Sequence, residues 1–299
     1  MVIYKLENKI QEANMTNTLL GKPVADKITD EIKIEVKNLK KNNITPKLSI
    51  IRVGSNPSDM AYERGALKRM EKSGIETKIH ELPEDINEDD FVSVLEEVNN
   101  DKDTHGILIF RPLPKQLREE KIKYTILPAK DVDCFSPVNV AKIFEGDESG
   151  LPPATPAAVI ETLKHYDVDL KGKNVVVVGR SLVVGKPVSM MLLKENATVT
   201  ICHSKTKELE KVASQGDILV AAVGRDRMIN SKYIKKDAIV IDVGINVDSN
   251  GNMHGDVDFE DVKDKASMIT PVPRGVGSVT TSTLAKNVVK ACKQINGLK

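Results

Sequence analysis

The sequence predicts an α/β protein with two domains, built on parallel sheets that are covered by helices. Short apolar runs rich in β-branched residues recur along the chain, and amphipathic stretches of helical period separate them. The runs are continuously apolar rather than alternating, which is typical of parallel strands buried on both faces. With 299 residues, 40% of them apolar, the chain is long enough for two hydrophobic cores.

A first domain is expected over residues 15–150. Met15 opens the stretch "MTNTLLGKPVADKI", so the 14 residues before it are expected to form an extension. Strands are expected at "KLSIIRV" (47–53) and "GILIF" (106–110), and a helix is expected from Ser58 to Gly74. The domain ends at "EGDESGLPPATPAAV", where acidic and glycine residues give way to prolines and a helix can start near Thr155, with Pro156 at its first position.

A second, doubly wound domain is expected over residues 151–279, in the order β-α-β-α-β-β. The helix expected at "TTSTLAKNVVKACKQI" has Leu284, Val288, Val289 and Cys292 on one face, and residues 280–299 are expected to complete the first domain. The apolar runs of the second domain are "NVVVVG" (174–179), "ATVTIC" (197–202), "DILVAAVG" (217–224), "AIVIDVG" (238–244) and "SMITPV" (267–272).

Composition excludes several classes of function. The chain has 44 basic and 43 acidic residues, so no overall field favours nucleic acid or an anionic membrane. It has neither an apolar run of membrane-spanning length nor a signal sequence, which predicts a cytoplasmic protein. Cys134, Cys202 and Cys292 are widely spaced and form no C-x-x-C pair, which argues against a disulfide framework and a zinc site. No metal site is expected.

The stretch "NVVVVGRSLVVGKP" predicts a dinucleotide site. Gly179 allows a tight turn after a buried strand, and Gly185 allows close approach before a helix whose first N–H groups favour a phosphate. The spacing meets the G-x-G-x-x-G pattern only in part. The next strand ends without the acidic residue typical of NAD sites, whereas Arg180 and Ser204 can hold a 2′-phosphate. NADP is therefore favoured, with NAD as the alternative, and His203 is expected to pack rather than to catalyse.

Further motifs occur in a fixed order from Gly21 to the C-terminus. They include "LSIIRVGSNPSDMAY", "KDVDCFSPVN", "VVGRSLVVGKP", "IVIDVGIN", "GDVDF" and "ITPVPRGVGSVT". Together they resemble the methylenetetrahydrofolate dehydrogenase/cyclohydrolase family. The resemblance implies a folate-binding domain and a Rossmann domain across a cleft, usually in a homodimer. It also implies a role in one-carbon metabolism, with oxidation of methylenetetrahydrofolate by NAD(P) and hydrolysis of the methenyl product.

The resemblance also assigns residues to the site. Tyr62 matches the tyrosine that stacks on the folate ring, and Asp133 matches the aspartate that hydrogen-bonds the pterin; these two are the catalytic candidates. The other folate-side candidates are Arg69, Phe110, Arg111, Pro273, Gly275, Val276, Gly277 and Thr280. The cofactor-binding candidates are Gly179, Arg180, Ser181, Gly185, Lys186, Pro187, His203, Ser204, Thr206, Val223, Gly224, Gly244 and Ile245.

The chain departs from the family pattern at four positions. Ala66 stands where the family has a lysine four residues after the tyrosine, and Phe110 stands where it has the glutamine that orients this lysine. Lys68, at i+6 from Tyr62, points to nearly the opposite side of the helix and is a poor substitute. Cys134 and Arg274 replace glycines, and Arg274 is expected to strain its turn if that position needs positive φ.

These departures favour a dehydrogenase with weak or absent cyclohydrolase activity. Hydrolysis needs a group that moves protons, whereas hydride transfer mainly needs alignment of two rings. Two alternatives remain: a bifunctional enzyme whose site is rearranged around Arg69, Arg111 or Lys68, and a catalytically silent dinucleotide-binding scaffold. An amino-acid or shikimate-type dehydrogenase fits the folate-like motifs less well.

Overall fold

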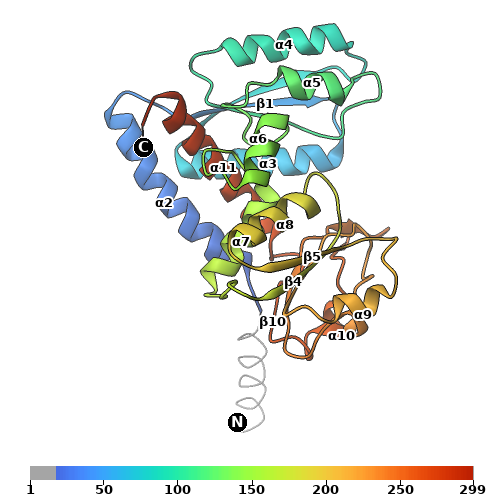
Figure 1. The fold of residues 1–299 in the computed structure, drawn as a ribbon. Coiled ribbons are helices and arrows are strands. Elements are labelled where there is room, and N and C mark those ends of the chain that lie inside the picture. The colour runs from blue at the N-terminus through green and yellow to red at the C-terminus, as the bar shows by residue number, and fades with distance from the viewer. Residues whose placement is uncertain (1–17, 299) are drawn as a thin grey trace, which may run out of the picture. The chain divides into compact units, whose positions relative to one another are not determined.

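The computed structural model describes residues 18–298, which form two compact units (Figure 1). The three-stranded unit contains residues 25–154 and 280–298, and the five-stranded unit contains residues 18–24 and 155–279. The expected extension of 14 residues and the domain start at Met15 lie outside the described residues. The two-domain α/β fold predicted from the sequence is confirmed. None of the helices between residues 18 and 298 combines the length and hydropathy of a membrane crossing.

The three-stranded unit is built on a parallel sheet of order β2-β1-β3. In Figure 1, α4 and α5 cover one face of this sheet, and α3 and α11 lie on the other. Two of the strands were predicted, but β2 was missed because it is an exposed edge strand with the mixed sequence "ETKIHEL". The elements are α2 (Gly21–Lys41), β1 (Lys47–Val53), α3 (Pro57–Ser73), β2 (Glu76–Leu82), α4 (Glu88–Asn100), β3 (Gly106–Ile109), α5 (Glu119–Thr125), α6 (Pro137–Glu145) and α11 (Gly277–Ile295).

Helix α3 confirms the helix predicted after the first strand, and local sequence sets both of its ends. The side chain of Asn56 accepts a hydrogen bond from the N–H of Ser58 at 2.9 Å, and Pro57 occupies the first turn, where its missing N–H costs nothing. Gly74 ends the helix in the left-handed conformation, with φ of 76°. Ala66 and Met70 are fully buried, so this side of the helix faces the core.

A buried ion pair fixes α3 to the central strand of the sheet. Arg52 on β1 is 3% exposed, and its Nε donates to Oε2 of Glu63 at 2.9 Å. The same guanidinium lies 3.1 Å from the carboxylate of Glu81 on β2 and donates to the carbonyl oxygen of Gly54. Because Glu63 follows Tyr62 directly, this pair determines where Tyr62 stands relative to the sheet.

The five-stranded unit has a parallel sheet of order β10-β7-β6-β4-β5, as expected for a doubly wound domain. The predicted β-α-β-α-β-β order is present in β4, α8, β5, α9, β6 and β7. Helix α7 begins at Ala154, so Pro156 lies in its first turn rather than at its first position. The elements are α7 (Ala154–His165), β4 (Asn174–Val178), α8 (Gly185–Lys194), β5 (Thr198–Cys202), α9 (Leu209–Ala213), β6 (Ile218–Ala221), η1 (Ser231–Tyr233), β7 (Ile239–Asp242), β8 (Asn246–Val247), β9 (Met253–His254), α10 (Phe259–Val262) and β10 (Met268–Ile269).

Two of the positions where the chain departs from the family pattern that it resembles have left-handed backbone. Cys134 has φ of 58° and Arg274 has φ of 80°. In this region the Cβ of an ordinary residue approaches its own carbonyl oxygen, whereas glycine has no Cβ to clash. The strain expected at Arg274 from the sequence is therefore present, and Cys134 shows the same conformation beside Asp133.

Arg274→Gly is expected to raise the free energy of unfolding by about 0.5–1 kcal/mol. Left-handed backbone costs a residue other than glycine about 1–2 kcal/mol, and part of this gain is offset by the greater freedom of glycine in the unfolded chain. The side chain of Arg274 is exposed, so its removal loses little packing. The shift of the urea midpoint measures the effect.

Arg274→Ala is the matched control, because it removes the same side chain and keeps the Cβ. Its midpoint is expected to stay at the wild-type value. A glycine variant that is no more stable than the alanine variant contradicts the assignment of strain.

Candidate functional site

The cofactor candidates of the five-stranded unit gather at one edge of its sheet. In the parallel register Val178 on β4 pairs with both Cys202 on β5 and Ala221 on β6. The loops that follow these strands therefore begin side by side, and the loop after β7 joins them because Ala221 also pairs with Asp242. This carboxyl edge is where ligands bind in open α/β sheets.

The turn between β4 and α8 has room for a backbone only. A Cβ added to Gly179, whose φ is +143°, would lie 2.2 Å from the carbonyl oxygen of Ala222. A Cβ added to Gly185 would lie 2.3 Å from the carbonyl oxygen of Gly179. Both glycines are needed for this close approach, which forms a cradle of the kind that a dinucleotide phosphate requires.

The N–H groups in the first turn of α8 were expected to be available to a phosphate, but several of them already have partners. The Oγ of Ser181 accepts hydrogen bonds from the N–H groups of Val184 and Gly185, at 3.1 and 3.3 Å. The carbonyl oxygen of Ser181 accepts from Lys186 at 3.0 Å, and Pro187 has no N–H. Ser181 thus caps the helix, and the exposed cations of Arg180 and Lys186 remain as the charges beside the cradle.

The loop after β5 is closed by its own side chains. Thr206 Oγ1 accepts a hydrogen bond from the N–H of His203 at 2.9 Å, and His203 Nδ1 accepts from the N–H of Lys205 at 3.1 Å. His203 therefore shapes the loop, and its expected role in packing rather than in catalysis stays a prediction. Ser204 lies exposed in this loop, two residues beyond Cys202, as Arg180 lies two residues beyond Val178.

Two buried aspartates were not among the predicted site residues, yet they shape the loops that contain the remaining cofactor candidates. The carboxylate of Asp256 accepts hydrogen bonds from the N–H groups of Val223 and Gly224, at 2.5 and 2.8 Å. Asp242 accepts from the N–H of Gly244 at 2.9 Å, and burial raises the pKa of Asp242 to about 7 against the effect of these hydrogen bonds. Exposed Ile245 follows. The available signal was an acidic residue within each of two motifs, Asp242 in "IVIDVG" and Asp256 in "GDVDF".

The loop that leads into α11 is tightly packed. A Cβ added to Gly275 would lie 2.3 Å from the carbonyl oxygen of Pro271, and the carbonyl oxygen of Arg274 accepts a hydrogen bond from the N–H of Gly21 at 2.8 Å. Pro273 lines a pocket of about 870 Å³ in the five-stranded unit. Of the other candidates here, Val276 is buried, Gly277 is exposed, and Thr280 lies within α11 in the part assigned to the three-stranded unit.

Four folate-side candidates come together in the three-stranded unit. The rings of Tyr62 and Phe110 meet edge to face, with centroids 5.8 Å apart. Arg111 Nη2 lies 3.9 Å from Asp133 Oδ2, and its guanidinium stacks 4.5 Å above the ring of Phe135. Thus Tyr62, Phe110, Arg111 and Asp133, which we call the tyrosine cluster, combine two aromatic rings with a cation and a carboxylate.

The electrostatics of the tyrosine cluster are set by burial. Burial, and then the charge of Asp133, raise the pKa of the Tyr62 hydroxyl, so this group stays protonated. Burial also raises the pKa of Asp133, while a hydrogen bond from the N–H of Ala154 and the charge of Arg111 lower it. The cluster therefore has one permanent cation and one carboxyl group with a perturbed pKa.

The positions around Ala66 do not bring a lysine to the tyrosine cluster. Ala66 is fully buried, and Lys68 is exposed. Arg69 Nη1 donates to Thr29 Oγ1 at 2.7 Å, and its Nε donates to Thr281 Oγ1 at 3.4 Å. Arg69 thus ties α3 to α2 and α11 rather than joining the other folate-side candidates.

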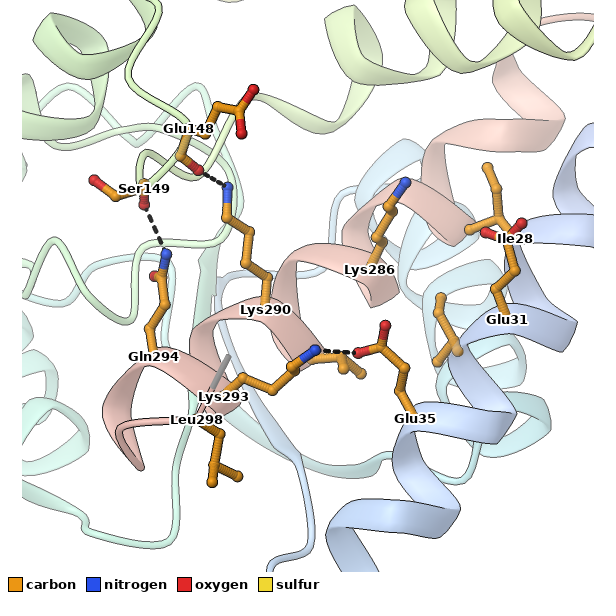
Figure 2. A pocket seen from close by; sticks show the side chains of 12 residues that line it. Ile28, Glu31, Glu35, Glu148, Ser149, Lys286, Lys290, Lys293, Gln294 and Leu298 are labelled. Atoms are coloured by element: carbon orange, nitrogen blue, oxygen red, sulfur yellow. Dashed lines mark hydrogen bonds and ion pairs between the residues drawn. The ribbon is translucent and has the colours of Figure 1, made fainter.

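A pocket of about 580 Å³ between α2 and α11 contains none of the predicted site residues (Figure 2). Its charged side chains make structural contacts. Lys293 lies 3.1 Å from the carboxylate of Glu35, and Lys290 donates to the carbonyl oxygens of Glu148 and Gly150. These contacts fasten α11 to α2 and to the loop after α6.

Two family models match the chain. The catalytic domain of tetrahydrofolate dehydrogenase/cyclohydrolase matches residues 19–133, and the NAD(P)-binding domain of the same family matches residues 153–296. The relative named bifunctional protein FolD from Alkaliphilus oremlandii (strain OhILAs) is 63% identical over 279 residues, which are 93% of this chain and 98% of the relative.

Solved structures agree with these matches. Bifunctional FolD from Campylobacter jejuni has a TM-score of 0.90 at 41% identity, covering 93% of this chain and 98% of that one. FolD from Trypanosoma brucei, solved with NADP and an inhibitor, has a TM-score of 0.88 at 34% identity, covering 93% and 97%. The chain therefore belongs to the tetrahydrofolate dehydrogenase/cyclohydrolase family and is an NAD(P)-dependent methylenetetrahydrofolate dehydrogenase.

Proposed function

We propose that the enzyme transfers a hydride from 5,10-methylenetetrahydrofolate to NADP⁺ and hydrolyses the methenyl product weakly or not at all. One observation carries the proposal: buried Ala66 occupies the position one helical turn after Tyr62. The packing of the Phe110 ring against Tyr62 supports it. The same proposal assigns a binding site to each unit. Folate binds at the tyrosine cluster, and the dinucleotide binds at the carboxyl edge of the five-stranded sheet.

Hydride transfer makes few demands on side-chain chemistry. The folate loses a hydride and becomes the methenyl cation, and the nicotinamide gains that hydride, so no side chain has to accept or donate a proton. The protein has to hold two rings in contact at the correct angle. Aromatic contact from Tyr62 and hydrogen bonding to Asp133 are suited to this task.

Hydrolysis makes a different demand. Water adds to the methenyl carbon, a C–N bond breaks, and one proton is released, so a group that exchanges protons near neutral pH is needed. A buried lysine can be tuned to do this, whereas arginine keeps its proton. The cation of the tyrosine cluster is Arg111, which supports loss of the proton-handling step.

The bifunctional alternative has two observations in its favour. Several relatives, including one at 63% identity, are named bifunctional protein FolD. In addition, burial raises the pKa of Asp133, which brings its carboxyl group closer to the range in which it exchanges protons. In this form of the alternative Asp133, rather than Arg69, Arg111 or Lys68, replaces the family lysine as the proton-handling group.

The choice of NADP over NAD is supported by the loops after β4 and β5. Arg180 and Ser204 are exposed, and each lies two residues along the chain beyond the end of its strand, β4 or β5, which pair with each other. No acidic residue follows β5 before Glu208. A guanidinium and a hydroxyl group can bind a 2′-phosphate, whereas an acidic residue at this place would repel it.

Paired assays on the purified protein test the proposed function. One follows formation of reduced cofactor from methylenetetrahydrofolate with NADP⁺ and then with NAD⁺, and the other follows loss of the methenyl compound. Reduction is expected to be faster with NADP⁺, and hydrolysis is expected to be at least about 100-fold slower than reduction, since general acid–base catalysis contributes about 10²–10⁴-fold. Comparable turnover in both assays supports the bifunctional alternative, and binding of NADP without reduction supports the silent scaffold.

Restoring the missing pair is expected to restore hydrolysis. Ala66→Lys combined with Phe110→Gln supplies an amine and the amide that orients it, and is expected to raise methenyl hydrolysis by about 10²-fold or more. Ala66→Met is the matched control, because it adds similar volume at the same buried position without an amine. A folded double variant that hydrolyses no faster than the methionine variant contradicts the proposal.

We also propose a homodimer that forms through β5. This strand is an edge of the five-stranded sheet, and an unpaired edge strand is a template for pairing with a second copy. Ile201 on β5 is 37% exposed, and Leu193 on the adjacent helix α8 is 55% exposed. Such apolar exposure beside an open strand edge is typical of a surface that is covered in an assembly.

Ile201→Lys is expected to convert the dimer to a monomer by placing a charge on this edge. Light scattering coupled to size-exclusion chromatography measures the mass. Ile34→Lys, which makes the same change at a 65% exposed position of α2, is expected to leave the dimer intact. A monomeric wild-type protein, or a dimer that survives Ile201→Lys, contradicts pairing through β5.

We place the enzyme in the cytoplasm. Cys134, Cys202 and Cys292 are buried and free, as is usual where thiols are kept reduced. Cell fractionation is expected to recover the enzyme with cytosolic markers, and recovery with membrane markers contradicts this placement.

A further inference from the structure

Arg111 lies between an aromatic ring and the carboxylate of Asp133. We propose that Arg111 is a positioning residue that keeps Asp133 ionised and oriented to accept hydrogen bonds from the folate ring. This inference rests on the proposed function, because it assigns the folate ring to Asp133. Arg111 directly follows Phe110, which stands at the family's glutamine position.

The carboxylate of Asp133 is held from one side by the backbone. Its Oδ1 accepts a hydrogen bond from the N–H of Ala154 at 2.9 Å. Its Oδ2 faces Nη2 of Arg111 at 3.9 Å, and the side chain is 26% exposed. The distance between Oδ2 and the guanidinium leaves the second oxygen free of a direct hydrogen bond from Arg111, so the cation acts on Asp133 through its charge.

The orientation of Arg111 is fixed by stacking. Its guanidinium lies 4.5 Å above the ring of Phe135, which is itself 8% exposed, and the Arg111 side chain is 19% exposed. The negative face of an aromatic ring attracts a cation, and the attraction strengthens as the cation becomes desolvated. Phe135 therefore holds the charge of Arg111 near Asp133, and it does so without neutralising that charge as a second carboxylate would.

Four titratable or charged groups act on Asp133 or are acted on by it: Arg111, Asp131, Tyr62 and Cys134. Asp131 is a second carboxylate, and its hydrogen bonds from the N–H groups of Phe135 and Ser136 hold it in place. Tyr62 and Cys134 have raised pKa values, so they stay neutral. Arg111 is thus the one cation of the set, and it opposes both burial and Asp131.

An ionised carboxylate is the form that a pteridine ring requires. The amino group and the adjacent ring N–H of a folate pterin donate from one edge, and two carboxylate oxygens can accept both hydrogen bonds. A protonated carboxyl group would present a donor in place of one acceptor. The family lysine would supply a positive charge beside Tyr62, and here Arg111 supplies it from the end of β3 while the lysine position is Ala66.

The pH dependence of kcat/KM for methylenetetrahydrofolate tests this role. Without Arg111 the pKa of Asp133 rises, so activity, which needs the ionised form, is lost at a higher pH as the solution is acidified. Arg111→Gln is expected to move the acid limb upward by about one pH unit, because a nearby opposite charge shifts a pKa by about 1–3 units when it is close and less when it is partly solvated. On the acid side this shift is a tenfold loss of kcat/KM, carried mainly by KM.

Two further variants separate charge from structure. Arg111→Lys keeps the charge and is expected to keep the acid limb within about 0.3 pH unit of wild type, because the carboxylate responds to the cation rather than to its shape. Lys68→Met removes an exposed cation from α3 and is expected to leave the profile unchanged. If Arg111→Gln lowers kcat/KM equally at every pH, Arg111 has only a structural role and the proposal is overturned.

A carboxyl ¹³C NMR titration of Asp133, assigned with Asp133→Asn, keeps the test independent of catalysis. The apparent pKa of Asp133 is expected to be higher in Arg111→Gln than in wild type. If the wild-type protein forms no reduced cofactor, the proposed function fails while this titration still tests the role of Arg111. Equal pKa values in the two proteins overturn the inference even when the enzyme is active.

Discussion

The ion pair between Arg52 and Glu63 is the constraint on which the tyrosine cluster depends. Both side chains are less than one-tenth exposed, and removing one partner of such a pair costs about 3–5 kcal/mol because the other charge is left buried. Arg52 belongs to the central strand of its sheet, and Glu63 follows Tyr62. The same strand pairs with β3, which ends at the residue before Phe110. One ion pair and one strand pairing therefore set the distance between the two rings of the tyrosine cluster.

Carboxylates organise the five-stranded unit in a similar way, but they bind backbone rather than arginine. Asp256 gathers three consecutive N–H groups after β6, and Asp242 joins the end of β7 to the segment that contains Asp256. Short loops at the carboxyl edge of a sheet have many N–H groups without partners, and a buried carboxylate satisfies several at once. The conformation of the loops that contain the cofactor candidates thus depends on two residues outside the predicted site.

The sequence was sufficient where a local pattern determines the structure and insufficient where distant residues meet. Continuous apolar runs identified the buried strands β1, β4, β6 and β7, and the flanking turn residues identified α3. Strand β2 escaped because an exposed edge strand has no apolar run. The positive φ of Arg274 followed from a glycine position, yet the stacking of Arg111 on Phe135 and the capping of α8 by Ser181 depend on geometry that spacing alone does not fix.

The two proposals for the tyrosine cluster constrain each other through Asp133. A lysine beside Tyr62 would supply both a positive field and a transferable proton, whereas Arg111 supplies the field alone. If that field keeps Asp133 ionised and its oxygens accept hydrogen bonds from the folate ring, the lone pairs that could take a proton from water are already in use. The hydrogen bonds by which Asp133 binds the folate ring for hydride transfer then prevent Asp133 from accepting a proton during hydrolysis. Strong binding through Asp133 and efficient hydrolysis by Asp133 are therefore competing uses of one side chain.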